Sequence, residues 1–161
     1  MRLMILVGTM TGTAELVAEE LQNALEAQGH EIEVRLMDGL DAGVFARRDT
    51  CLVVISTYGQ GDVPDNTRAL VESLQRDRPD LSRLRYGVIA LGDRTYSATY
   101  CRGGRQFDEA LGALGARRVG EMLLHDASAG TLPEEVAVEW IPGWMSALEG
   151  ELAGEAVGGN A

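Results

Sequence analysis

Lysine is absent from the sequence: all 14 basic residues are arginine. Lysine Schiff-base chemistry, P-loop nucleotide hydrolysis and a lysine general base are therefore excluded in their usual forms. The two cysteines, Cys51 and Cys101, are too few for a disulfide scaffold. The two histidines, His30 and His125, have no partners at ligand spacing, so no metal site is predicted. No Ser-His-Asp set or activated cysteine can be assembled, and we predict no catalytic residues.

Long apolar runs and a basic surface are also missing. The first apolar run, residues 3–7, is too short for a signal peptide, and no run approaches the length of a membrane-spanning helix. We therefore expect a cytoplasmic location and no membrane contact. Asp and Glu number 25, and the net charge is −11. This acidity argues against nucleic-acid binding and favours electrostatic steering toward basic protein partners.

The order of the predicted elements indicates an α/β fold. Apolar runs predict buried strands, whereas the alternation at 31–37 predicts an edge strand. The pattern predicts a doubly wound, five-stranded parallel sheet in the order 2-1-3-4-5. One domain is expected over residues 1–149, with a flexible tail at 150–161. The predicted strands are 2–7, 31–37, 51–55, 86–91 and 117–125, and the helices are 13–28, 67–76, 103–114 and 133–149, the last kinked or restarted at Pro142.

The turn after the first strand is rich in glycine and threonine. A strand, a Gly/Thr turn and a helix in succession direct backbone N–H groups at an anion, and Thr9, Thr11 and Thr13 add hydroxyls. No lysine follows Gly12, and Gly8 and Gly12 stand too far apart for the dinucleotide fingerprint. A terminal phosphate group is the favoured ligand. The alternative is an ordinary strand-to-helix turn with threonine caps.

Two further loops, at 56–66 and 91–101, follow the third and fourth strands. In the predicted sheet, all three loops meet at the carboxyl ends of the strands, where such folds bind ligands. Tyr58, Tyr96 and Tyr100 are three of the four tyrosines, and they provide aromatic walls opposite the phosphate loop. Gly59 and Gly61 allow the backbone to approach a ring edge. The three loops therefore predict a slot for a flat, phosphorylated ring.

The three motifs resemble those of the flavodoxin family and of the FMN domains of diflavin reductases. Residues 9–13 match the family's phosphate loop, 57–66 match T-Y-G-x-G-D-x-x-D-N, and 91–96 match L-G-(D/N)-x-x-Y. The resemblance covers about residues 1–149. The last strand has no long insertion, so the chain resembles the short-chain members.

The resemblance implies non-covalently bound FMN, with the phosphate at the first loop and the flavin ring between Tyr58 and Tyr96. Met10 stands where the family often has a polar residue, and Tyr100 lies one residue beyond the usual spacing. Cys101 is expected near the ring in a packing role, and Asp126 near the flavin or ribityl edge. The residues expected at the cofactor are Thr9, Met10, Thr11, Gly12, Thr13, Ala14, Ser56, Thr57, Tyr58, Gly59, Gln60, Gly61, Leu91, Gly92, Asp93, Tyr96, Tyr100 and Cys101.

The resemblance also implies a function. The implied function is that of a monomeric electron carrier. It would pass electrons from an NADPH-dependent flavoprotein reductase to an acceptor redox enzyme and would bind both through transient electrostatic contacts. Arg94, Arg102 and Arg105 cluster around the third loop and are hypothesised to help dock a partner. One alternative is an FMN-dependent quinone or flavin reductase. A receiver-type signalling domain shares the strand order, but it needs an aspartate at the end of the third strand and a lysine after the fifth. Here the third strand ends in Ser56, and lysine is absent.

Overall fold

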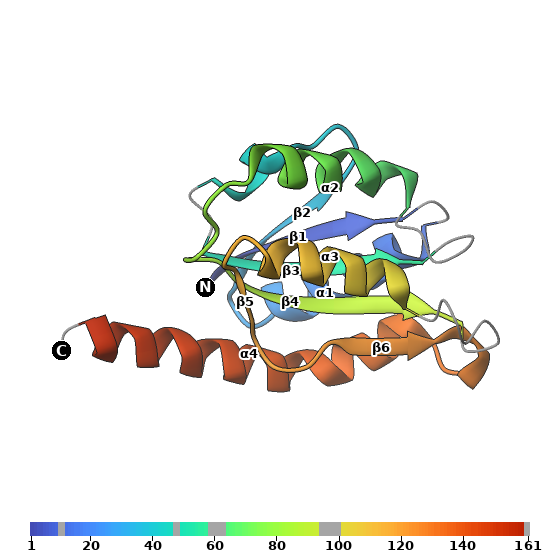
Figure 1. The fold of residues 1–161 in the computed structure, drawn as a ribbon. Helices are drawn as coiled ribbons and strands as arrows, with labels where there is room; N and C mark the ends of the chain where they lie inside the picture. The colour runs from blue at the N-terminus through green and yellow to red at the C-terminus, as the bar shows by residue number, and fades with distance from the viewer. Residues whose placement is uncertain (10–11, 47–48, 58–63, 94–100, 160–161) are drawn as a thin grey trace.

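The computed structural model describes residues 1–9, 12–46, 49–57, 64–93 and 101–159. Strands and helices alternate along most of the chain, as Figure 1 shows. The elements are β1 (Arg2–Gly8), α1 (Thr13–Glu26), β2 (Glu31–Leu36), β3 (Thr50–Ser56), α2 (Asp65–Asp77), β4 (Arg85–Gly92), α3 (Arg102–Gly112), β5 (Arg117–Arg118), β6 (Leu123–Asp126) and α4 (Pro133–Gly159), with short 3-10 turns at Ala42–Phe45 and Ala127–Ala129.

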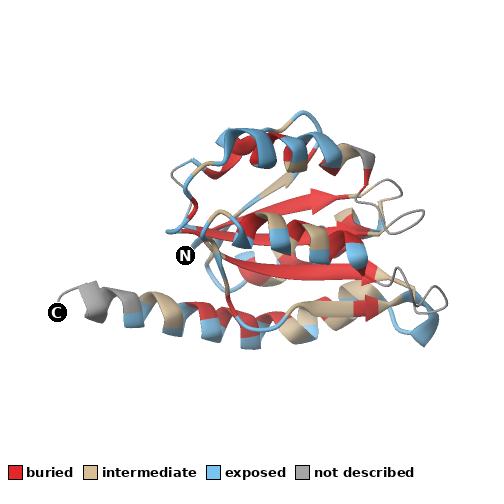
Figure 2. Ribbon diagram, in the orientation of Figure 1, coloured by how far each residue is buried: buried red, intermediate tan, exposed pale blue. Residues whose placement is uncertain are grey.

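The sheet is parallel, and its order β2-β1-β3-β4-β5 confirms the predicted one. Helices cover both faces, and the buried residues concentrate in the central strands (Figure 2). Side chains alternate between the faces, as the two-residue period of a strand requires. In β1, for example, Leu3 and Ile5 join the core beneath α1 and α4, whereas Met4 and Leu6 join the core beneath α2 and α3.

The last strand differs from the prediction, which placed one continuous strand over residues 117–125. Two short strands occupy that position: β5 pairs with the start of β4, and β6 pairs with its end. Between them the backbone of Gly120 turns to a φ of 67°. The carbonyl of Val119 accepts a hydrogen bond from the Trp144 indole at 3.2 Å, which satisfies the interrupted backbone at this point.

The last helix is longer than predicted. It was expected to end at Glu149, but α4 continues to Gly159 as one helix through Pro142. Alanine, leucine and glutamate in residues 150–157 favour a helix. Leu152 also packs against the core beneath α1 and α4, and Glu151 pairs with Arg117 at 3.4 Å. The flexibility expected for residues 150–161 stays a prediction. In the described part of the chain, no helix has the length and apolarity needed to span a membrane.

Tyr86 anchors β4 to α3 through a partly buried polar contact. Its hydroxyl donates to Asp108 Oδ1 at 2.6 Å, and Asp108 Oδ2 accepts from Arg118 at 2.8 Å. Burial, followed by the hydrogen bond to Asp108, raises the pKa of Tyr86 well above its usual value. The phenol therefore stays protonated in the folded protein.

This shift predicts the pH dependence of a Tyr86→Phe variant. At neutral pH the variant should be about 1–2 kcal/mol less stable, because Asp108 loses a donor. The pKa is raised by folding, so the phenol's contribution is full below the unfolded pKa of about 10 and declines above it. Urea unfolding of both proteins at neutral pH and at about pH 10.5 should show the difference shrinking at the higher pH. A difference that grows there would contradict the assignment.

Candidate functional site

The register of the sheet places the ends of the central strands side by side. Gly8 pairs with Ile55, Ser56 with Leu91, and Gly92 with Asp126. The loops that follow β1, β3 and β4 therefore start at one edge, where α1, α2 and α3 also begin. Several predicted cofactor residues lie outside the described residues, so their roles stay predictions: Met10, Thr11, Tyr58, Gly59, Gln60, Gly61, Tyr96 and Tyr100.

The first loop turns into α1 at Gly12, whose φ of 92° lies in the left-handed region that favours glycine. Its N–H donates to Thr9 Oγ1 at 3.1 Å, which closes the turn. The N–H groups of Thr13 and Ala14 have no partner within the helix, because they belong to its first turn. Together with the helix dipole they suit an anion. Ala14 is fully buried and belongs to the core beneath α1 and α4.

The second loop is fixed to α3 at its start. Ser56 is buried at the end of β3, and Thr57 Oγ1 accepts a hydrogen bond from the N–H of Gly103 at 2.9 Å. A Cβ at position 103 would lie 2.6 Å from the Ser56 carbonyl oxygen, so only glycine allows this approach. The Thr57 hydroxyl therefore holds α3 against the end of β3.

The third loop leaves β4 through Leu91, Gly92 and Asp93, of which Leu91 is buried. The loop returns at Cys101, a fully buried residue that precedes α3 with a φ of 55°. Its thiol donates to the carbonyl of Ala90 at 3.4 Å. This environment agrees with the expected packing role of Cys101 and keeps the sulfur away from solvent.

Two polar residues at this edge accept hydrogen bonds from backbone N–H groups. Asn66 lies in α2, which begins at Asp65 rather than at the predicted residue 67, and its Oδ1 accepts the N–H of Thr9 at 3.1 Å. The only sequence signal for this contact is that Asn66 closes the second motif. Asp126 was expected near the flavin or ribityl edge, and this role stays a prediction. Its carboxylate accepts the N–H of Ser128 at 2.9 Å and caps the following turn.

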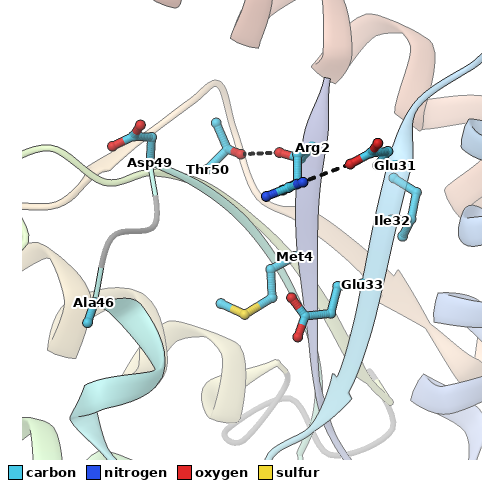
Figure 3. Close-up of a pocket in the computed structure, with 8 residues that line it drawn as sticks. All are labelled: Arg2, Met4, Glu31, Ile32, Glu33, Ala46, Asp49 and Thr50. Atoms are coloured by element: carbon cyan, nitrogen blue, oxygen red, sulfur yellow. Dashed lines mark hydrogen bonds and ion pairs between the residues drawn. The ribbon is translucent and has the colours of Figure 1, made fainter.

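A separate groove of about 610 Å³ lies at the other end of the sheet, beside the start of β1 (Figure 3). Glu31, Glu33 and Asp49 line it, and its one described cation, Arg2, pairs with Glu31 at 3.1 Å. Carboxylates repel a phosphate, so this groove is a poor candidate for a phosphorylated ligand. Among the residues that the structure describes, no three His, Cys, Asp or Glu side chains gather as they would around a metal ion.

The N-terminus of α1 lies at the carboxyl ends of adjoining parallel strands, which is where doubly wound α/β proteins hold their ligands. Comparison with known proteins narrows this class. The model of the family described as Flavodoxin matches residues 5–140, and the chain belongs to the flavodoxin family of electron-transport flavoproteins.

Individual relatives agree with this assignment. The chain is 44% identical to Flavodoxin YqcA of Escherichia coli K12, over 89% of this chain and 96% of that protein. It superposes on the C101S mutant of flavodoxin from Pseudomonas aeruginosa with a TM-score of 0.83 and 39% identity, over 92% and 99% of the two chains. It is also 34% identical to the sulfite reductase [NADPH] flavoprotein alpha-component of Bacillus subtilis, over 98% of this chain and 24% of that protein.

The contact between Thr57 and Gly103 predicts the effect of a Thr57→Val variant. Valine keeps the shape of threonine but cannot accept the N–H of Gly103, which is left partly buried without its partner. We expect a loss of about 1–2 kcal/mol in the free energy of unfolding, measured with urea, and faster hydrogen exchange at the Gly103 amide. Thr57→Ser keeps the hydroxyl and serves as the control. A loss in Thr57→Ser with none in Thr57→Val would show that methyl packing, rather than the hydrogen bond, is what matters at this position.

Proposed function

We propose that the protein binds FMN at the edge where α1, β3 and β4 meet, and carries electrons between two partner proteins. The first-turn N–H groups of α1 and the hydroxyl of Thr13 would hold the phosphate. Ser56 and Gly92 would lie along the ring, with the tyrosines predicted from the sequence stacked on its faces. FMN, when bound, supplies the ability to take up and release electrons one at a time.

The observation that carries this proposal is the N-terminus of α1. It has no side-chain cap among the described residues, and it lies at the carboxyl ends of the strands. The three loop motifs and the family assignment support FMN rather than another phosphorylated ring. The charge of the chain also bears on its redox behaviour. A net charge of −11 disfavours an additional negative charge on a reduced ring and therefore lowers its potential.

An NADPH-dependent flavoprotein is the proposed electron donor. The Bacillus relative is named as an NADPH sulfite reductase flavoprotein, and the region similar to this chain makes up 24% of it. That arrangement supports a reductase as the partner from which a separate carrier of this kind receives electrons. The monomeric state, the cytoplasmic location and the identity of the acceptor stay predictions.

The first experiment is the visible spectrum of the purified protein, with added FMN where needed. We expect a yellow complex that releases FMN on denaturation and takes up two electrons in separate stages on titration with dithionite. Mixed with NADPH alone, the complex should stay oxidised, and reduction should begin when a flavoprotein reductase is added. Steady NADPH consumption by the protein alone would favour the quinone or flavin reductase alternative. A protein that refuses FMN would overturn the proposal.

A docking role is proposed for Arg102 and Arg105, which are exposed in the first turns of α3 beside the site. Cations at a helix N-terminus interact unfavourably with the helix dipole, so arginine side chains at these two positions do not stabilise the helix. The third residue of the predicted cluster, Arg94, lies outside the described residues. Two guanidinium groups beside the site suit carboxylates on a partner surface.

Replacing Arg102 and Arg105 together by glutamine tests this role. At low salt, the second-order rate of reduction by the partner reductase should fall roughly threefold to tenfold, because electrostatic steering is lost. The difference should fade as ionic strength rises toward 1 M, where the Debye length is about 3 Å. Arg83→Gln, an exposed arginine at the amino end of β4, is the matched control. Equal rates at all salt concentrations would exclude the role.

A further inference from the structure

We propose that Asn66 is a positioning residue for the phosphate loop, and this inference rests on the proposed binding of FMN. Asn66 lies 57 residues beyond Thr9 in the sequence, in the first turn of α2. Its side chain contacts the loop through the backbone of Thr9. Through this contact it would set the direction in which the loop leaves β1, without touching the ligand.

The carboxamide of Asn66 joins three segments of the chain. Its Oδ1 accepts the N–H of Thr9 at 3.1 Å, and its Nδ2 donates to Asp38 Oδ2 at 3.2 Å. The fully buried Thr67 hydroxyl also donates to Asn66 Oδ1 at 3.2 Å. The end of β1, the turn after β2 and the start of α2 are therefore linked by one planar group.

The partners determine the orientation of this amide. A backbone N–H can only donate, so the atom that faces Thr9 is the oxygen, and the amino group then faces the carboxylate of Asp38. Asparagine provides an acceptor and a donor on one short side chain, which aspartate and alanine do not. Position 66 therefore requires a short side chain that carries both an acceptor and a donor.

The link has a direct consequence for the phosphate loop. With its N–H bonded to Asn66, Thr9 is held where its Oγ1 accepts the N–H of Gly12 at 3.1 Å. That bond closes the turn, and α1 begins immediately after Gly12. Asn66 thus acts on the anion site through Thr9 and Gly12, so its loss should weaken binding of the phosphate more than binding of the flavin ring.

The test compares FMN with riboflavin, which has the same ring and no phosphate. Affinities are measured by quenching of flavin fluorescence. Asn66→Ala should weaken FMN binding about tenfold, as expected for a partly buried hydrogen bond and a loosened turn. Riboflavin binding should change by less than about twofold on the same scale. Asn23→Ala, an exposed asparagine in α1, is the matched control and should leave both affinities unchanged.

An exchange of the two side chains keeps the test decisive if Asn66→Ala fails to fold. Asn66→Asp places a second carboxylate against Asp38, so FMN binding should weaken. Adding Asp38→Asn restores a donor facing an acceptor, and the double variant should recover affinity that the single variant lost. Asp38→Asn alone should be close to neutral, because its amide oxygen can accept from Asn66 Nδ2.

A readout in the absence of flavin tests the contact itself. Hydrogen exchange at the Thr9 amide, followed by NMR, should accelerate in Asn66→Ala and keep its wild-type rate in Asn23→Ala. The inference is overturned if the wild type binds FMN and Asn66→Ala binds it equally well, or if FMN and riboflavin lose affinity in the same proportion. A wild-type protein that binds neither flavin would instead refute the proposed function.

Discussion

The parallel register of β1, β3 and β4 is the constraint on which the rest of the structure depends. It pairs Gly8 with Ile55 and Ser56 with Leu91, so the three loops begin at one level. The same register assigns alternate side chains to the two cores, one under α1 and α4 and the other under α2 and α3. A shift by one residue would turn apolar side chains to the wrong face, so the packing of both cores holds the site in place.

The first two loops are also tied to helices, and the third is bonded back to the strand it follows. The first loop is bonded to α2 through Thr9 and Asn66, and the second to α3 through Thr57 and Gly103. The third returns to β4 through the Cys101 thiol. Each such bond contributes only about 0.5–1.5 kcal/mol to stability. Their larger effect is to limit how the loop ends can move, which lowers the ordering cost of binding a ligand.

Two exposed arginines lie at this edge of an acidic protein. The chain carries a net charge of −11, yet Arg102 and Arg105 are exposed where α3 starts. An electron carrier must bind partners briefly and in a defined orientation, and uneven charge provides orientation with little added affinity. The polar contact among Tyr86, Asp108 and Arg118 is of a different kind, since it lies within the fold and secures α3 to β4.

The sequence by itself determined the strand order, the edge position of β2 and the place of three loops at the carboxyl ends of the strands. These features follow from local signals, namely apolar periodicity, glycine-rich turns and short motifs, and they are independent of distant contacts. The length of α4 was missed because Leu152 and Glu151 gain partners in other elements. The division of the last strand was missed because it depends on the backbone at Gly120 and on Trp144 from α4.

The tertiary structure alone decided which polar groups hold the ends of the loops together. Asn66 and Thr57 belong to motifs readable in the sequence, yet their partners are Thr9 and Gly103, which lie 57 and 46 residues away. A hydrogen bond requires its atoms to lie within about 3 Å at a suitable angle. Local sequence patterns carry no information at that distance, and only the packed sheet and helices bring such atoms together.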